Sequence, residues 1–414
     1  MGFSKDFIWG AASSSYQIEG AAYEDGKGLS VWDIFCRKPD VIRNNQTGDV
    51  ACDHYHRYVE DVALMKEIGI KAYRFSISWP RILPDGTGKV NEKGLDFYKR
   101  LVDELLKNGI EPYITLFHWD YPYELYKKGG WLNSESPDWF SEYTKIVVEN
   151  LSDRVKNWMT LNEPQCFILL GHDIGKHAPG VKLGFTEVLQ ATHNSLLAHG
   201  KSVQAINSFS KQKCIIGYAP VGQTAVPETN SPEDIEAARI YMFESFEKNK
   251  FVNSLWMDPV ILGSYPEKLL KSLEQWMPDI KQDDLKTICQ PIDYLGVNIY
   301  TAPNVFLRNG EMEYAPMKNG FARTAINWTV EPESLYWGPR LFYERYKTPI
   351  VITENGLSNT DWVSLDGKVH DPQRSDFMDR YIGSLKRAAS DGVDVKGYFH
   401  WSIMDNFEWG EGYN

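Results

Sequence analysis

Short strand-like runs recur along this chain and alternate with helical stretches. The runs cover residues 8–12, 72–78, 113–117, 158–161, 215–219, 294–300, 350–353 and 397–401. Between most of them, apolar residues return every three or four positions, as in amphipathic helices; examples are residues 55–68, 92–108 and 377–390. This alternation predicts an α/β fold with a parallel sheet that helices cover.

The number of strands decides between the two common α/β architectures. Eight parallel strands can close into a barrel, and several of these runs are apolar on both faces, so we predict a (β/α)8 TIM barrel. The alternative is a doubly wound open sheet, but no predicted strand is followed by a G-x-G-x-x-G motif or a phosphate-binding loop. No Pro/Ser-rich linker interrupts the chain, so we predict that residues 1–414 form a single domain.

Glycine and serine mark several of the predicted helix ends. Gly69, Gly109 and Gly392 each follow a predicted helix and precede a strand, as a left-handed helix cap does. Ser136 and Ser231 each precede a proline, which predicts a capping hydroxyl before the first helical residue.

The eighth predicted strand is followed by only about a dozen residues, too few for a closing loop and an eighth helix together. We therefore expect the barrel to lack its final helix. Apolar surface beside the first and eighth strands should then be exposed unless another segment covers it.

The charge balance limits the expected partners. Lys plus Arg number 44 and Asp plus Glu 56, which gives a formal net charge of −12. An acidic protein repels polyanions, so neither nucleic acid nor an anionic membrane is expected as a partner. The longest apolar runs, such as residues 166–170, fall far short of the ~20 residues that a membrane-spanning helix needs.

Two further features concern the compartment. The first residues contain no apolar signal-peptide segment. The five cysteines are widely spread and form no C-x-x-C pair, which suits reduced thiols. We therefore expect a soluble, cytoplasmic protein.

Polar and aromatic residues gather where the predicted strands end. In a TIM barrel, the carboxyl ends of the strands meet on one face and form the active site. The residues at these ends or just beyond them are Gln17, Arg74, His118, Trp119, Asn162, Glu163, Asn298, Tyr300, Glu354, Trp401, Glu408 and Trp409. Glu163 and Glu354 come from separate strands, so we expect two carboxylates to face one cavity.

A pair of carboxylates is what the cleavage of a glycosidic bond requires. One protonates the leaving oxygen, and the other stabilises or captures the oxocarbenium-like centre. A lone glutamate at a strand end more often caps a loop. Two such glutamates, with Asn162 and aromatic residues beside them, favour a glycosidase.

The motifs that carry these residues resemble glycoside hydrolase family 1, the β-glucosidase family. The similar segments are residues 7–12, 15–20, 73–81, 116–119, TLNEP at 160–164, 295–298, ITENG at 352–356, 401–402 and 405–409. They lie in order and on the predicted strand ends. The resemblance implies a retaining β-glycosidase that hydrolyses terminal, non-phosphorylated β-D-glucosides, with galactosides and fucosides as further candidate substrates.

The resemblance also implies roles for the two glutamates and their neighbours. Glu354 would attack the anomeric carbon while Glu163 donates a proton to the leaving oxygen and later takes one from water. Arg74 and Tyr300 would keep Glu354 ionised and oriented, with Asn298 as a further supporting residue. Two carboxylates at ~5 to 5.5 Å, the separation in retaining enzymes, do not both stay charged easily. Glu163 should therefore have the higher pKa, and activity should follow a bell-shaped pH profile.

The residues expected to contact the sugar offer polar groups or aromatic faces. Asn162 would bind the hydroxyl beside the anomeric carbon. The others are Gln17, His118 and Glu408 for the remaining hydroxyls, Trp119, Trp401 and Trp409 as walls, and Trp328 as an outer platform. Trp79 and Trp158 are expected in the core, and Trp401 and Trp409 outside it.

Two positions bear on substrate choice. Family members that act on phosphorylated sugars have Ser, Lys and Tyr in the loop that here holds Glu408, and a carboxylate there would repel phosphate. The family usually has Trp after Asn-Glu-Pro, as part of the leaving-group site, but this chain has Gln165. The family's aglycone preference therefore does not carry over.

Other functions are less well supported by the sequence. The nine histidines include no H-E-x-x-H motif, so neither a metal nor a cofactor is expected. A non-catalytic sugar-binding member usually lacks one catalytic glutamate, and both stand here. A barrel hydrolase or aldolase of other chemistry needs an active Ser or Lys at a strand end. Because the final helix is expected to be missing, a β-glucosidase with impaired activity is a further alternative. Family members are often homo-oligomers, so a homo-oligomer is possible here as well.

Overall fold

The computed structural model describes residues 2–244, 250–317 and 319–413. Within these ranges, eight parallel strands close into a barrel in the order β1, β11, β10, β7, β5, β4, β3 and β2. They are β1 Ile8–Ala12, β2 Ala72–Ser76, β3 Glu111–Phe117, β4 Asn157–Asn162, β5 Ile215–Ala219, β7 Tyr294–Asn298, β10 Ile350–Asn355 and β11 Val395–Trp401. Each corresponds to one predicted strand, and no boundary differs by more than two residues.

Closure of the barrel depends on contacts of its first strand with both neighbours. Gly10 of β1 lies opposite Phe399 of β11 on one side and opposite Ala72 of β2 on the other. An open, doubly wound sheet would instead leave two free edges. The TIM barrel is therefore confirmed, and the alternative architecture is excluded.

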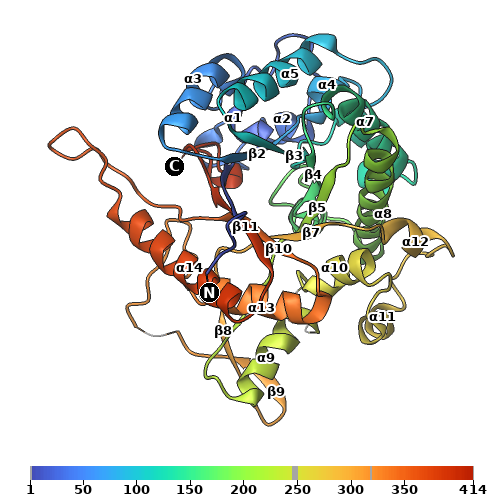
Figure 1. Ribbon diagram of the computed structural model, residues 1–414. Helices are drawn as coiled ribbons and strands as arrows, with labels where there is room; N and C mark the ends of the chain where they lie inside the picture. Colours follow the sequence, from blue (N-terminus) through green and yellow to red (C-terminus); the bar gives the residue numbers. More distant parts are fainter. Residues whose placement is uncertain (1, 245–249, 318, 414) are drawn as a thin grey trace.

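Helices cover the outside of the barrel (Figure 1). The longer ones are α3 His54–Glu67, α5 Glu92–Lys107, α7 Ser136–Leu151, α8 Phe185–Phe209, α9 Pro232–Phe243, α10 Asn253–Ile261, α13 Ser334–Tyr346 and α14 Pro372–Ser390. The amphipathic pattern predicted three of them, and α5 buries Leu101, Val102 and Leu105 as that pattern requires. None of the helices in the described ranges combines the length and the apolar character that crossing a bilayer needs.

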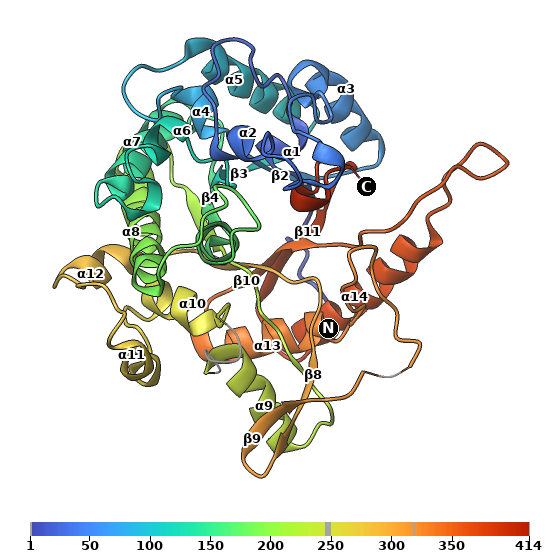
Figure 2. The same cartoon turned by 180° about the vertical axis from the view of Figure 1, so that it is seen from behind.

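Shorter elements lie in the loops. They are α1 Ser15–Ile18, α2 Val31–Phe35, α4 Trp79–Ile82, α6 Tyr123–Tyr126, α11 Glu267–Leu273, α12 Asp284–Ile288, η1 Arg43–Asn45, η2 Gly130–Leu132, η3 Cys166–Asp173 and η4 Trp409–Glu411. A small sheet of β6 Val226–Pro227, β8 Asn304–Arg308 and β9 Glu311–Tyr314 lies beside α9, apart from the barrel, in both views (Figures 1 and 2). Its strands follow β5 and β7, so they lengthen loops at the carboxyl ends of the barrel strands.

Side chains fill the inside of the barrel. One buried cluster there consists of Ala12, Ala72, Tyr113, Met159, Ala219, Tyr294, Val351 and Phe399. Gly10 makes room for this packing, because a Cβ atom added to it would lie only 2.5 Å from the Phe399 ring. The interior of the barrel is thus filled with side chains and forms no channel. The polar residues of a TIM barrel accordingly lie at the carboxyl ends of its strands.

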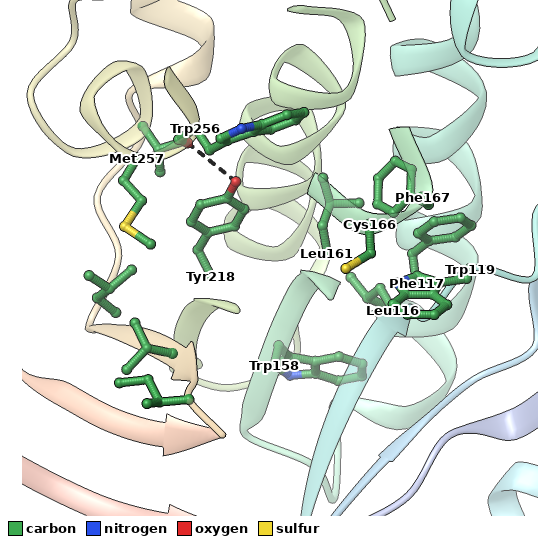
Figure 3. Close-up of a cluster of buried hydrophobic side chains, with 14 of the residues drawn as sticks. Leu116, Phe117, Trp119, Trp158, Leu161, Cys166, Phe167, Tyr218, Trp256 and Met257 are labelled. Carbon is green, nitrogen blue, oxygen red and sulfur yellow. Dashed lines mark hydrogen bonds between the residues drawn. The ribbon is translucent and has the colours of Figure 1, made fainter. Parts of the chain in front are cut away.

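A larger apolar core lies between the strands and the helices (Figure 3). Trp158 and Trp256 are fully buried there, and Tyr218 donates a hydrogen bond to the main-chain oxygen of Trp256 at 3.3 Å. Trp79 is fully buried as well. The prediction that Trp79 and Trp158 belong to the core is therefore confirmed.

The predicted glycine caps and one of the two predicted serine caps are present. Gly69, Gly109 and Gly392 have φ angles of +86°, +72° and +98°, in the left-handed region that glycine adopts without strain. The Ser231 hydroxyl accepts a hydrogen bond from the main-chain N–H three residues on, at 3.1 Å. These residues therefore end or begin their helices as the sequence indicated.

The prediction for Ser136 is wrong. It is the first residue of α7, Glu135 occupies the capping position, and the Ser136 hydroxyl is buried without a hydrogen bond in the described part of the chain. The Asn133 side chain instead accepts a hydrogen bond from the Glu135 main-chain N–H at 2.9 Å. This hydrogen bond belongs to a turn before the helix, and no described side chain caps the first N–H groups of α7.

The seam between β1 and β11 has less cover than the rest of the barrel. Among the described residues, η4 is the only helical segment after β11. Trp9, on the outer face of β1, is 41% exposed, as expected where no helix covers the strand. Phe3 and Phe7 pack against Trp9 with ring centroids at 5.4 and 4.6 Å. The amino-terminal segment therefore covers part of this apolar surface.

Candidate active site

The predicted site residues lie at the carboxyl ends of the barrel strands. Arg74 lies within β2, Asn162 ends β4, Asn298 ends β7 and Glu354 lies near the end of β10, while Glu163 directly follows β4. Because the barrel strands are parallel, these ends form one rim. The remaining predicted residues are Gln17 in α1, His118 and Trp119 after β3, Tyr300 after β7, Trp328 before α13, Trp401 at the end of β11, and Glu408 and Trp409 in the loop after it.

Two side chains hold the Glu354 carboxylate. Its Oε1 accepts a hydrogen bond from Arg74 Nη1 at 2.6 Å, and its Oε2 accepts one from Tyr300 Oη at 2.7 Å. Both predicted contacts are therefore present. Burial raises the pKa of Glu354, while the Arg74 guanidinium and the Tyr300 hydroxyl lower it. The two contacts fix the direction of the carboxylate, as a nucleophile requires.

Glu163 is held by a neutral group. Its Oε1 accepts a hydrogen bond from Asn298 Nδ2 at 2.9 Å. Burial raises the pKa of Glu163, and the negative charge of Glu354 raises it further. A buried carboxyl group with a raised pKa keeps its proton at higher pH, as a general acid must.

A hydrogen-bonded path joins the two carboxyl groups. Asn162 Oδ1 accepts from Arg74 Nη2 at 2.6 Å and from Asn298 Nδ2 at 3.0 Å, so it links the partner of Glu354 to the partner of Glu163. The negative charge of Glu354 raises the pKa of Glu163, which agrees with this proximity. The 5 to 5.5 Å separation of the carboxylates remains a prediction.

His118 lies beside this path as a neutral imidazole. Its Nε2 accepts a hydrogen bond from Asn162 Nδ2 at 3.1 Å. Burial, and then the charge of Arg74, lowers the pKa of His118 well below its usual value. Its Nδ1, which then carries the hydrogen, has no hydrogen-bond partner in the described part of the chain. Its contact with a sugar hydroxyl remains a prediction.

The aromatic residues of the site differ in exposure. Trp119 is buried and donates from Nε1 to the main-chain oxygen of Asn162 at 3.0 Å, so it also supports the path. Trp401 is partly exposed and stacks on the His118 ring with centroids at 5.6 Å. The prediction that Trp401 lies outside the core therefore agrees with the structure.

The prediction that Trp409 stays outside the core is wrong. Its side chain is only 6% exposed. The indole packs against Trp119 and Trp32, with ring centroids at 4.3 and 4.5 Å, and stacks on Tyr16. These aromatic residues come from four separate segments of the chain, and no pattern in the sequence indicates that they enclose one another.

Gln17 is fully buried and already hydrogen-bonded. Its Nε2 donates to Asn406 Oδ1 at 2.8 Å and to the main-chain oxygen of Phe407 at 2.9 Å. Its Oε1 accepts from the Ser14 hydroxyl at 2.6 Å. Gln17 therefore ties the loop after β11 to α1, and its contact with a sugar hydroxyl remains a prediction.

Glu408 and Trp328 lie nearer to solvent. Glu408 is partly exposed, and no side chain among the described residues hydrogen-bonds its carboxyl group. Burial, and then the charges of Glu354 and Glu411, raises the pKa of Glu408 to about 7. Trp328 is 42% exposed and lies 5.4 Å from Tyr300 between ring centroids. Their roles in sugar binding remain predictions.

One supporting residue escaped the sequence reasoning. The Thr353 hydroxyl donates to Asn298 Oδ1 at 2.6 Å, which turns the Asn298 amide so that its nitrogen faces Glu163. A threonine inside a strand looks like an ordinary strand residue, so only its position directly before Glu354 offered a signal. In the described ranges, no three His, Cys, Asp or Glu side chains are grouped so that they could hold a metal ion.

Comparison with known proteins agrees with this geometry. The model of Glycosyl hydrolase family 1 matches residues 1–414. Beta-glucosidase A of Acetivibrio thermocellus is 46% identical over 419 aligned positions, which cover 100% of this chain and 92% of that protein. Beta-glucosidase A of Thermotoga maritima is 43% identical over 415 positions, which cover 100% of this chain and 91% of that protein.

Solved structures extend the likeness to three dimensions. The structure of the beta-glucosidase from Thermotoga maritima in complex with glucoimidazole gives a TM-score of 0.90 at 43% identity, and the match covers 100% of this chain and 92% of that one. With the strand-end glutamates, the barrel and the full-length match in agreement, the chain belongs to glycosyl hydrolase family 1.

Proposed function

We propose that this protein is a retaining β-glucosidase that hydrolyses terminal, unphosphorylated β-D-glucosides by double displacement. The observation that carries the proposal is the hydrogen-bonded path between Glu354 and Glu163. It joins a carboxylate paired with a cation to a carboxyl group that burial keeps protonated. The relatives named beta-glucosidase support glucosides as the substrate class.

In the first step, an ionised oxygen of Glu354 attacks the anomeric carbon. The bond from that carbon to the leaving oxygen breaks while Glu163 gives its proton to this oxygen, and the product is a glycosyl ester of Glu354. Arg74 and Tyr300 keep Glu354 ionised and aimed at the carbon. The path through Asn162 keeps the two glutamates at a fixed relative position during this step.

In the second step, water replaces the leaving group. Glu163, now ionised, takes a proton from the water as its oxygen attacks the anomeric carbon, and the ester bond to Glu354 breaks. Two inversions restore the β configuration. Glu163 then carries a proton again and Glu354 is ionised, so the enzyme returns to its starting state.

Glu408 supports the choice of an unphosphorylated sugar. Its carboxyl group has no hydrogen bond from a described side chain, so its oxygens are open to accept sugar hydroxyls. A phosphate on the sugar would bring a second negative charge against it, which costs binding energy. Glucose, galactose and fucose all lack a phosphate, so Glu408 does not distinguish between them. The names of the relatives favour glucose.

The first-formed anomer tests the proposal. An aryl β-glucoside is incubated with the protein, and NMR spectra are recorded before the product equilibrates. Retention gives β-glucose first. Early α-glucose would rule out double displacement, and no turnover by the folded protein would favour a non-catalytic sugar-binding role instead.

We also propose a cytoplasmic location. All five cysteines are free thiols in the structure, which suits a reducing compartment. Fractionation of the source cells with an antibody against the protein tests this, and recovery outside the cytoplasm would contradict it. Assembly into a homo-oligomer remains a prediction, which sedimentation velocity measures.

A further inference from the structure

Gln165 stands two residues after Glu163, and its side chain faces inward. It is fully buried, although it lies beside the residues expected to meet substrate. Its Nε2 donates to the main-chain oxygen of Val221 at 3.1 Å, and its Oε1 accepts from the main-chain N–H of Val221 at 3.1 Å. Both polar ends of the amide are thus bonded to one peptide segment, so neither is open to a ligand.

These two hydrogen bonds continue the ladder between β4 and β5 beyond the strand ends. The main-chain N–H of Glu163 donates to the Ala219 oxygen at 2.8 Å. Two residues further along each chain, the Gln165 side-chain amide pairs with Val221 as a peptide group of a strand would. The amide therefore adds one rung to the sheet, at the point where the backbone of Glu163 has left it.

The same segment of chain holds Asn298. Val221 pairs with Asn298 in a parallel bridge, and the Gly222 N–H donates to the Asn298 oxygen at 2.9 Å. Asn298 in turn donates to Glu163 Oε1 at 2.9 Å. Gln165, Val221, Asn298 and Glu163 thus form a closed circuit that fixes the Glu163 carboxyl group from both its backbone and its tip.

The backbone of Glu163 explains why such a circuit matters. Its φ angle is +46°, a left-handed conformation that costs a non-glycine residue free energy and persists only when neighbouring contacts impose it. Without the Gln165 rung, this segment can relax toward an ordinary conformation. The carboxyl group would then move relative to Asn298 and to the bound sugar.

We propose that Gln165 is a positioning residue for the proton transfer by Glu163, and not part of the leaving-group binding surface. The inference rests on the proposed role of Glu163 as the acid and base. It concerns a position at which this chain departs from the Trp usual in the family. A buried amide with both ends hydrogen-bonded to Val221 fixes the position of the backbone beside Glu163. An exposed Trp ring at this position would instead offer a surface for the leaving group to contact.

The test substitutes Gln165→Met, which keeps the length of the side chain and removes both hydrogen bonds. kcat/KM is measured for a series of aryl and alkyl β-D-glucosides whose leaving groups differ in pKa. We expect kcat/KM to fall by about tenfold to a hundredfold for poor leaving groups, because they need the proton from Glu163. It should stay within about twofold for a dinitrophenyl glucoside, which needs little acid catalysis.

Two other patterns would overturn the proposal. An equal loss for good and poor leaving groups would mean that Gln165 only supports the fold. A loss that follows the size of the aglycone at matched leaving-group pKa, and that appears in KM, would mean that Gln165 lines the aglycone site. Gln212→Met is the control, because it removes an amide hydrogen bond to the Ser152 oxygen away from the site.

A second variant covers the case in which Gln165→Met does not fold. Gln165→Glu can form both hydrogen bonds to Val221 when its carboxyl group is protonated, and only one when it is ionised. Its activity toward poor leaving groups, relative to the dinitrophenyl glucoside, should therefore rise more steeply as pH falls than the same ratio does for the unmodified protein, in which only Glu163 titrates. Parallel pH profiles of this ratio for the variant and the unmodified protein would contradict the proposal. If the unmodified protein hydrolyses none of the glucosides, the proposed function fails, and not the inference about Gln165.

Discussion

The active site has two regions that hold their side chains in different ways. The first, called the floor here, consists of Arg74, Asn162, Glu163, Asn298 and Glu354 at the strand ends; the second is the loop after β11. On the floor, Arg74 is nearly fully buried and donates to both Glu354 and Asn162. In the loop, Glu408 is partly exposed, and only its main chain is fixed, through a hydrogen bond from its N–H to the Gly412 oxygen at 2.7 Å. The side chains of the floor are thus hydrogen-bonded to one another without substrate, whereas no described side chain donates a hydrogen bond to the Glu408 carboxyl oxygens.

This difference matches the two tasks of a glycosidase. Bond cleavage needs groups held in the geometry of the transition state, so reorganisation at the moment of reaction is small. Recognition of the sugar needs polar groups that exchange water for hydroxyls. We therefore expect substitutions on the floor to lower kcat and substitutions in the loop to raise KM.

The largest effect is expected on the floor, at Glu354. Glu354→Ala removes the nucleophile, so kcat should fall by about ten-thousandfold or more. Added azide fits the space left by the carboxylate and should restore turnover, with α-glycosyl azide as the product. The product is identified by NMR, and Glu142→Ala on the exposed face of α7 is the control. Recovery of β-glycosyl azide would assign the nucleophile elsewhere.

A smaller loss is expected at the other glutamate. Glu163→Gln keeps the hydrogen bond from Asn298 geometrically possible but has no proton to give. kcat/KM for poor leaving groups should fall by about a hundredfold to ten-thousandfold, and that for good leaving groups much less. Stopped assays across aryl glucosides measure this dependence. A uniform loss would contradict the assignment of Glu163 as the proton donor.

The loop should respond in KM. Glu408→Gln removes a charge that strengthens hydrogen bonds to sugar hydroxyls, so KM should rise by about tenfold to a hundredfold with a smaller change in kcat. Because the pKa of Glu408 is raised to about 7, its ionised form appears above that pH. KM of the unmodified enzyme should therefore fall as pH rises through about 7, and KM of the variant should not.

Asp405→Asn is the matched control for this prediction, because Asp405 is exposed in the same loop. A change in kcat alone for Glu408→Gln would place Glu408 with the floor residues. The comparison between the two regions would then lose its basis. A glucoside phosphorylated on the sugar gives a second measurement: the variant should discriminate against it less than the unmodified enzyme does.

The smallest effect concerns stability. The pKa of Glu163 is higher in the folded state than in the unfolded chain, where it is about 4.3, so the folded state binds more protons between the two values. The unmodified protein therefore loses stability as pH rises through that window. Glu163→Gln has no such titration and should be more stable by about 1–3 kcal/mol above the window, and nearly equal below it.

Because the pKa of Glu163 in the folded state is raised to about 8, urea unfolding near pH 4 and near pH 9 measures this difference. Glu142→Gln is the control, since Glu142 is exposed and its substitution leaves the site intact. An equal gain at both pH values would show that burial of the Glu163 charge is not the cause. The predicted gain would set the floor apart from the loop, because buried catalytic groups are expected to lower the stability of the folded protein.

The strand pattern predicted the barrel because several strands are apolar on both faces, as strands covered by helices are, and because eight such strands alternate with helices. The same pattern placed Glu163 and Glu354 on one rim, since parallel strands end on one side. Arg74 and Tyr300 were predicted as the partners of Glu354 through the family resemblance, and both contacts are present. What followed from strand direction and from motifs could therefore be predicted.

Predictions about the surroundings of single side chains were less successful. Trp409 was expected outside the core, but Trp32, Trp119 and Tyr16 enclose it. Gln17 carries hydrogen bonds to residues almost four hundred positions away. These contacts depend on the path of the loop after β11, and no periodic pattern in that loop indicates its path.

The sequence by itself determined the barrel, the direction of its strands and the pair of glutamates at its rim, because apolar periodicity and strand order are local properties of the chain. Only the tertiary structure decided which amide orients Glu163, that the buried Gln165 amide pairs with Val221, and that Trp409 is buried. Each of these depends on hydrogen bonds or packing between segments far apart in sequence, and their geometry exists only when the whole barrel has closed.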